Sequence, residues 1–384
     1  MMLPRVVLRL DEAIAREDSP LARECLKAER AGVLARLGLM QEARFALAGL
    51  RSQAQRHRAP QLQAWVWMVD GLISHFETVA LHSGDKFRRA LALATTAQDQ
   101  PMMALTSAWL ACCAFNASDL PALSGHLTLA LQLAGPDHHA VHTRLGLVLG
   151  DSYRFAGDES RSRLWYQLAR RHAGLEGDTS MMSALLYNAT AMRAARVGLD
   201  DAFGQASLDE ARQALLEVES TINYDDGAGS AALAATVRLV RAQMMLVLGR
   251  LDEALVQFDA CRPGAVAQGS AHRDARFAAE RAWCLVQLGQ HERARQDMGE
   301  SQAALATTQD ADDRAAAHAR LAQCCQKLAQ PADAARHQAA ADQALRDHRA
   351  SQQAMLTMLS QTLAAVGQTH PAHGAGPGVV PTGR

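Results

Sequence analysis

Apolar and small residues recur along this chain with a period of forty residues. In each copy a Leu-Gly or Leu-Ala pair ends one apolar stretch, a short polar turn follows, and a second stretch with helical spacing begins. The clearest copies are marked by small residues at Ala254, Ala294 and Ala334. A fixed period of this length predicts stacked copies of one supersecondary unit, here a pair of antiparallel helices.

The same register extends toward the N-terminus at intervals of about forty residues. The further marker positions are Ala43, Ser83, Leu123, Ser162 and Ala211, which brings the number of units to about eight. The interval from 162 to 211 is enlarged, and we expect the extra residues in a loop at 200–206, with Ser207 capping the next helix. A small residue such as Gly71 stands twelve positions before most markers, where two helices of a hairpin must approach closely.

The two ends of the chain depart from the repeat. Residues 4–16 are predicted to form a short amphipathic helix within an N-terminal cap of residues 1–19, before a repeat array that spans 20–347. Residues 331–366 contain no Gly or Pro after the first position and predict one long helix, whose part beyond the array is an extension over 348–367. Residues 368–384 are rich in Gly and Pro and are expected to be disordered.

These positions resemble the tetratricopeptide repeat, in which a small residue, a turn Gly, an Ala and an aromatic follow one another at fixed spacing. Gly71 and Phe87 match that pattern, and so do Ala242, Ala254 and Phe258. The period here is longer than the family's period of about 34 residues, so the chain is similar to longer, divergent repeats. The resemblance implies an all-α fold, a right-handed solenoid of about eight antiparallel helical hairpins. Similar arrays occur in bacterial regulators, including the sensory halves of diguanylate cyclases and of MalT-type activators.

Composition argues against two classes of partner. The chain carries 39 Lys and Arg against 40 Asp and Glu, so there is no electrostatic case for nucleic acid or for an anionic membrane. The uncharged stretch 101–118 falls within the repeat register, which favours a buried helix over a membrane span. Seven cysteines without a CxxC motif are typical of reduced thiols in a cytoplasmic protein.

No motif for catalysis or for nucleotide binding occurs in the chain, and no signature of an output domain follows the array. His138 and His142 have the i, i+4 spacing of metal ligands, but two imidazoles make an incomplete site. We favour exposed histidines on a helix that begins at Asp137. We therefore expect no enzymatic activity, no cofactor and no metal site.

A ligand is expected on the first helix of each hairpin, because in tetratricopeptide arrays these helices line the concave groove. The groove positions lie three before, one after and four after the small residue of the first helix, and they share one helix face. Carrying these positions over predicts a site for a protein or peptide. Its residues are His75, Phe115, Asn116, Asp151, Arg154, Asn188, Met192, Gln243, Trp283 and Gln323. The alternative for Asp151 and Arg154 is that they pair with neighbouring helices of the same chain.

The last helix offers a second surface. Its apolar residues recur at intervals of three and four as a short seam, formed by Leu356, Leu359, Leu363 and Val366. This seam either packs back on the last hairpin, which we favour, or joins two chains into a homodimer.

Together these features predict a non-catalytic scaffold or adaptor that binds a protein or peptide, in the setting of a bacterial cytoplasmic regulator. The alternative is a ligand-sensing regulatory subunit whose output domain lies on another chain. An enzyme is the third choice.

Overall fold

The computed structural model describes residues 4–78, 83–228, 234–267 and 273–367. Within these ranges the chain forms 17 helices and no strand. The all-α fold class predicted from the repeat is therefore confirmed. The expected disorder of residues 368–384 concerns a segment outside the described residues.

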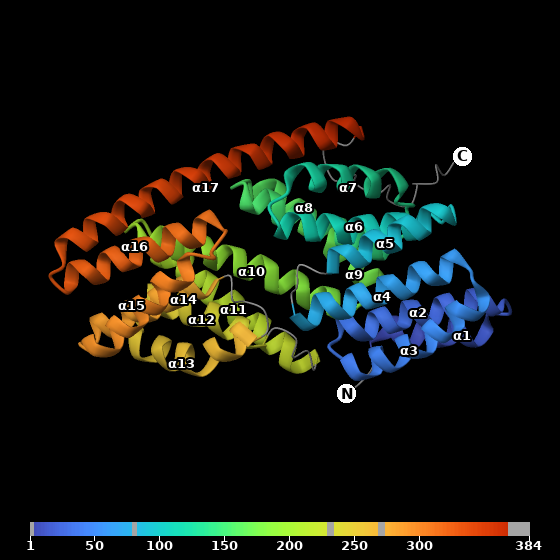
Figure 1. The fold of residues 1–384 in the computed structure, drawn as a ribbon, viewed down its shortest axis with the longest axis horizontal. Helices are drawn as coiled ribbons and strands as arrows, with labels where there is room; N and C mark the ends of the chain where they lie inside the picture. Colours follow the sequence, from blue (N-terminus) through green and yellow to red (C-terminus); the bar gives the residue numbers. More distant parts are fainter. Residues whose placement is uncertain (1–3, 79–82, 229–233, 268–272, 368–384) are drawn as a thin grey trace, which may run out of the picture.

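One helix, α1 (Arg5–Arg16), precedes eight helical hairpins that stack in chain order (Figure 1). The hairpins are α2 (Pro20–Arg36) with α3 (Met40–His57), α4 (Pro60–Thr78) with α5 (Ser83–Thr96), α6 (Gln100–Asn116) with α7 (Leu120–Leu133), α8 (His139–Phe155) with α9 (Glu159–Glu176), α10 (Thr179–Ala202) with α11 (Leu208–Ala228), α12 (Ala234–Val247) with α13 (Leu251–Ala267), α14 (Asp274–Gln287) with α15 (His291–Leu305), and α16 (Ala311–Lys327) with α17 (Pro331–Ala365).

The forty-residue register corresponds to the core of each hairpin. All eight marker residues are buried, namely Ala43, Ser83, Leu123, Ser162, Ala211, Ala254, Ala294 and Ala334. The small residue of the first helix is required by close packing, because a Cβ on Gly71 of α4 would lie 2.5 Å from Cε1 of Phe87 on α5. The turns also depend on glycine, since Gly249 and Gly289 adopt the left-handed conformation (φ 75°) two residues beyond the last residues of α12 and α14.

The enlarged fifth unit places its extra residues in helices and not in a loop. The prediction of a loop over 200–206 is wrong, because α10 continues to Ala202 and only residues 203–207 connect it to α11. Ser207 does cap α11, its Oγ accepting a hydrogen bond from the Glu210 amide at 3.3 Å. The added length allows α10 to reach a distant hairpin, where Leu199 and Ala202 are buried with alanines of α16. Helix α10 lies in the middle of the molecule and contacts α2, α8, α12 and α16 (Figure 1).

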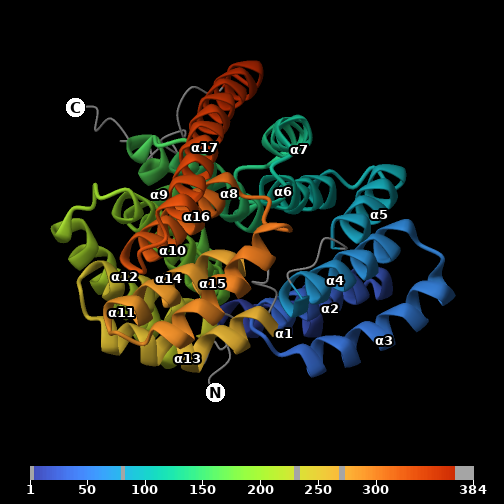
Figure 2. The same ribbon diagram turned by 60° about the vertical axis from the view of Figure 1, so that its left-hand side comes forward.

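The last helix closes the array on itself. Helix α17 packs along α16 and then extends across the third and fourth hairpins, where it contacts α7 and α8 (Figure 2). Leu359 and Leu363 are buried there against residues such as Leu127 of α7, while Leu356 and Val366 are half-buried. The expectation that the seam packs back on the last hairpin or joins a second chain is therefore corrected. Its two buried leucines are covered by hairpins far earlier in the same chain and are not available as a dimer seam.

The N-terminal cap is also held by a distant turn. The Val6 amide of α1 donates to the Gly177 carbonyl at 3.3 Å, and Arg36 of α2 pairs with the buried carboxylate of Asp178 at 2.5 Å. Both acceptors lie in the turn between α9 and α10. The first, fourth and fifth hairpins are thereby brought together.

The uncharged stretch 101–118 forms most of α6, where nine residues of the helix are buried. In the part of the chain that the structure describes, no helix is long and apolar enough to cross a membrane. The seven cysteines are all free thiols.

Candidate functional site

First helices of neighbouring hairpins pack against one another, α2 against α4 and α6, α8, α10, α12, α14 and α16 in succession, and we call these helices the inner layer. The ten predicted groove residues lie on these helices, but the structure gives them different surroundings. In the C-terminal half the inner layer is closed by contacts within the chain. In the middle, around α8 and α10, polar side chains remain partly accessible.

Gln243 on α12 is buried and does not face a ligand. Its Nε2 donates to both carboxylate oxygens of Glu280 on α14, at 3.1 and 2.8 Å. Glu280 in turn accepts from Arg276 at 2.9 Å, and Arg276 pairs with Asp313 of α16 at 3.0 Å. This ladder neutralises charges that the fold takes out of water, as buried ions require. The predicted ligand contact of Gln243 is thus replaced by an internal one.

Gln323 on α16 is also used within the chain. Its Nε2 donates to the Ala202 carbonyl at the end of α10, at 2.8 Å. The neighbouring Arg320 pairs with Asp201 on the same helix end. Trp283 on α14 is half-buried, with the Arg320 guanidinium 5.9 Å from its ring centre. These contacts occupy the surface on which we expected a ligand in the last hairpins.

The centre of the predicted site is a polar cluster formed by Asp151, Tyr166 and Asn188, which we call the Asp151 cluster. The Tyr166 hydroxyl donates to one oxygen of the Asp151 carboxylate, and the Asn188 Nδ2 donates to the other at 2.8 Å. Burial raises the pKa of Asp151 to about 6, although both hydrogen bonds act in the opposite direction. The cluster joins α8, α9 and α10 and presents a half-buried amide at Asn188.

Arg154 does not pair with Asp151. Its guanidinium donates to Glu159 of α9 at 2.9 Å and lies 5.5 Å from the centre of the Tyr166 ring. The alternative that both residues find partners on neighbouring helices of the same chain therefore describes what the structure shows. Met192, one turn beyond Asn188 on α10, is half-buried.

The predicted residues of the second and third hairpins lie on α4 and α6. His75 of α4 is half-buried, with its ring 5.3 Å from that of Trp109. Burial, with a smaller effect of Arg144, lowers the pKa of His75 to about 4, so this imidazole is neutral at pH 7. Phe115 contacts Phe155 edge to face at 6.4 Å, and Asn116 is exposed at the end of α6.

Arg144 is a residue that the groove positions did not include. It lies on α8 two turns before Asp151, and its side chain is almost entirely buried. Its guanidinium carbon is 3.5 Å from the centre of the Trp109 ring, and one nitrogen donates to Met181 Sδ at 3.2 Å. The available signal was a charged residue directly before the apolar run 145–149, seven positions before Asp151 and so on the same helix face.

The histidines near residue 140 pair with one another and with backbone. The Nδ1 atoms of His139 and His172 are 3.0 Å apart, and His142 Nε2 is 2.8 Å from the Gly135 carbonyl. Helix α8 begins after His138 and not after Asp137. Among the residues that the structure describes, no three His, Cys, Asp or Glu side chains are placed to hold a metal ion.

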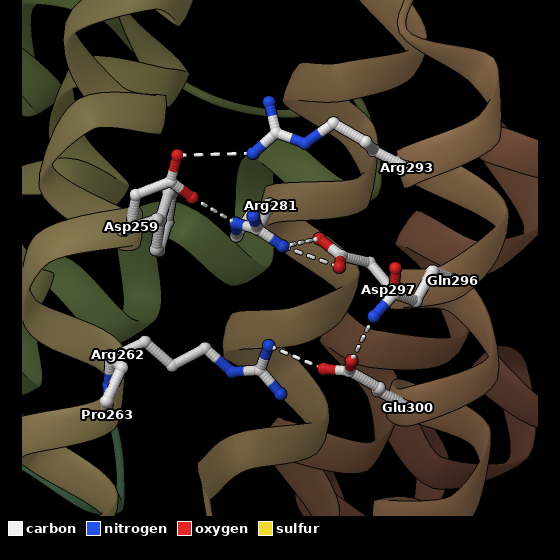
Figure 3. Close-up of a pocket in the computed structure, with 9 residues that line it drawn as sticks. Asp259, Arg262, Pro263, Arg281, Arg293, Gln296, Asp297 and Glu300 are labelled. Carbon is white, nitrogen blue, oxygen red and sulfur yellow. Dashed lines mark hydrogen bonds and ion pairs between the residues drawn. The ribbon is translucent and has the colours of Figure 1, made fainter.

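A cavity of about 250 Å³ lies between α13, α14 and α15 (Figure 3). Arg281 occupies its centre, pairing with Asp259 at 2.7 Å and with Asp297 at 2.5 Å. Arg262 pairs with Glu300 at 2.8 Å, and Arg293 with Asp259 at 3.2 Å. The three arginines already have carboxylate partners, so the lining has no uncompensated charge with which to attract a ligand ion.

Comparison with known proteins supports the fold. No family model and no curated protein matches the chain. Among solved structures the chain is similar to a Rap protein complexed with competence and sporulation factor, with a TM-score of 0.54 and 13% identity over 90% of this chain and 92% of that chain. A likeness at this identity shows the fold alone, and it supports a tetratricopeptide-like helical repeat.

Proposed function

We propose that this chain is a non-catalytic scaffold that binds an extended peptide or a segment of a partner protein beside the Asp151 cluster. The setting that we propose is a bacterial cytoplasmic regulator. The observation that carries the proposal is the half-buried amide of Asn188, oriented by its hydrogen bond to Asp151.

A side-chain amide in this position suits a peptide backbone. The Nδ2 of Asn188 is directed at Asp151, and within the described residues its carbonyl oxygen has no protein partner. That oxygen can accept from a peptide N–H, while the second Nδ2 hydrogen can donate to a peptide carbonyl. Because Asp151 holds the amide in place, little side-chain entropy is lost on binding.

The fold comparison adds to this argument. One similar solved structure is that of a Rap protein complexed with competence and sporulation factor, and we infer that the same architecture serves recognition here. A scaffold requires no catalytic constellation. We therefore propose that the chain acts by binding alone.

Replacing Asn188 with Ala tests the proposal. A pool of random peptides is passed over the immobilised protein, and the retained peptides are quantified by mass spectrometry. Asn223→Ala is the matched control, because Asn223 is an exposed asparagine on α11, a second helix. We expect Asn188→Ala to reduce retention about tenfold, the equivalent of about 1.4 kcal/mol, and Asn223→Ala to leave it unchanged. Equal retention by both variants and the wild type would rule out this site.

A second candidate function is a ligand-sensing regulatory subunit whose output domain is on another chain. The observation that favours it is Arg144, a buried cation at the inner layer. A small carboxylic acid as ligand would point to this function, and the experiment at the end of the next section separates the two.

A further inference from the structure

Among the residues that the structure describes, Arg144 is a buried cation without a counter-ion. Only 4% of its surface is exposed, yet in the described residues no carboxylate oxygen lies within 4 Å of it. Its Nε has no hydrogen-bond partner there. Every Asp and Glu of the chain falls within the described residues. The missing partner is therefore not an acidic side chain elsewhere in the sequence.

The nearest acidic groups are engaged by other residues. Asp151 accepts hydrogen bonds from Tyr166 and Asn188, and Asp178 pairs with Arg36 and accepts from the Ser180 amide. These carboxylates act on Arg144 only at a distance, and Arg36 adds a positive charge of its own.

The groups that do touch Arg144 are neutral. Met181 supplies a thioether, which is a weak acceptor, and Trp109 supplies a ring face. Burial raises the pKa of the nearby Cys112 to about 12, so this thiol is protonated at pH 7 and adds no negative charge. A buried guanidinium with neutral neighbours is costly, because most of its hydration is lost and no opposite charge replaces it.

The guanidinium that lacks an opposite charge is on the same helix as the Asp151 cluster. Arg144 and Asp151 are seven residues apart on α8 and lie on the same face of the helix. Two helical turns span about 10.5 Å, which is about the length of three residues of extended chain. Asn188 of α10 donates to Asp151 on this face. His75 of α4 and Cys112 of α6 lie close enough to Arg144 for its charge to lower the pKa of each. All three side chains are half-buried.

We propose that Arg144 binds a carboxylate of the ligand, and that a peptide beside the Asp151 cluster places its C-terminal carboxylate on the guanidinium stacked against Trp109. The proposal rests on the function proposed above and names the chemistry of its ligand. A planar guanidinium matches a carboxylate with two parallel hydrogen bonds. Nε and an adjacent terminal nitrogen supply these donors, and the ring of Trp109 holds the guanidinium plane in place.

The first test uses small carboxylates and needs no peptide. Thermal unfolding is measured in sodium acetate and in sodium chloride with acetamide, at equal ionic strength. The variants are Arg144→Gln and, as a control that removes the same charge, Arg163→Gln, since Arg163 is exposed on α9. We expect acetate to raise the Tm of the wild type and of Arg163→Gln, but not that of Arg144→Gln.

A purely structural role for Arg144 predicts a different result, in which Arg144→Gln lowers the Tm and acetate shifts all three proteins equally. Trp109 gives a second readout, because its ring lies against the guanidinium. Subtracting the fluorescence of Trp109→Phe from that of the wild type isolates the emission of Trp109, which should change when acetate is added. The same subtraction between proteins that also carry Arg144→Gln should show no change. An equal change on both backgrounds would overturn the proposal even if Arg144→Gln were unstable.

The second test uses three pools of random hexapeptides. One pool lacks Asp and Glu and ends in a free carboxylate, the second has the same composition but is amidated, and the third is amidated but contains Asp and Glu. We expect wild-type protein to retain the free-carboxylate pool at least about tenfold better than the amidated pool without acids. Arg144→Gln should abolish that preference. Retention of the third pool would identify a side-chain carboxylate as the ligand group.

The outcomes distinguish this inference from the proposed function. Peptide retention that ignores both the carboxylate and Arg144 would overturn the inference and leave the scaffold function intact. An acetate response that requires Arg144, without retention of any peptide, would support the carboxylate site and assign it to a free carboxylic acid, against the scaffold. Absence of both effects would overturn both.

Discussion

The hydroxyl oxygens of Ser124 and Thr362 are 2.7 Å apart, although 238 residues separate them in sequence. Ser124 belongs to α7 of the third hairpin, and Thr362 lies near the end of the last helix. A second contact, from Gln352 Nε2 to the Phe155 carbonyl at 2.8 Å, joins the same helix to the end of α8. The array is therefore closed by its own last helix.

The closing contact should contribute to global stability. Leu359 has no exposed surface and packs among buried residues of α7 and α8, so Leu359→Ala should lower the free energy of unfolding by about 2–5 kcal/mol. Urea denaturation followed by circular dichroism measures the change. Gln361→Ala, at an exposed position of the same helix, should change it by less than about 0.5 kcal/mol. Equal effects of the two variants would contradict the burial of this helix.

The need for small residues at the register positions can be tested with two glycine-to-alanine substitutions whose expected effects on stability are opposite. Gly71→Ala places a methyl group 2.5 Å from the Phe87 ring and should destabilise by about 1–3 kcal/mol through overpacking. Gly49→Ala, in α3, meets no atom within 4 Å and should stabilise by about 0.5–1 kcal/mol, because alanine favours a helix interior. Thermal unfolding of both variants provides the comparison. Stabilisation by Gly71→Ala would show that the two helices are farther apart than in this structure.

The buried carboxyl of Asp151 should make stability depend on pH in a defined direction. Its pKa is raised to about 6 in the fold, against about 3.9 in an unfolded chain. Between these values the folded state holds the proton and the unfolded state releases it. The stability contributed by Asp151 is therefore fully present below about pH 4 and is lost as the pH rises to about 6, up to about 3 kcal/mol in total.

Asp151→Asn isolates this effect, because the amide lacks the titration but keeps an oxygen that can accept a hydrogen bond. The difference in unfolding free energy between Asp151→Asn and wild type should increase from pH 4 to 6 in favour of the variant and then stay constant. Chemical denaturation at a series of pH values measures it. A difference that does not vary with pH would show that Asp151 titrates normally in the fold.

The repeat itself could be predicted from sequence because its contacts are local. The residues that meet within a hairpin, such as Gly71 and Phe87, are 16 positions apart, and similar pairs recur in most copies. Their periodicity placed all eight marker residues in the core and the turn glycines at helix ends. The hairpin pattern needed no knowledge of how distant units are arranged.

The candidate site was predicted only in part. Asp151 and Asn188 do come together, because the groove positions of neighbouring first helices face one another. Gln243 and Gln323 were expected at a ligand but are used by Glu280 and by the end of α10. Arg144 was missed, since a rule based on groove positions does not register a charge that lacks a partner.

The sequence by itself determined the eight hairpins, their cores and the helical class, because each depends on spacing within about forty residues. Only the tertiary structure decided how the array closes, through α10 against α16 and α17 against α7 and α8. Those contacts join segments more than one hundred residues apart, and no period relates such segments. For the same reason only the structure showed which polar groups are paired within the chain, and that Arg144 is buried with no carboxylate beside it in the described part of the chain.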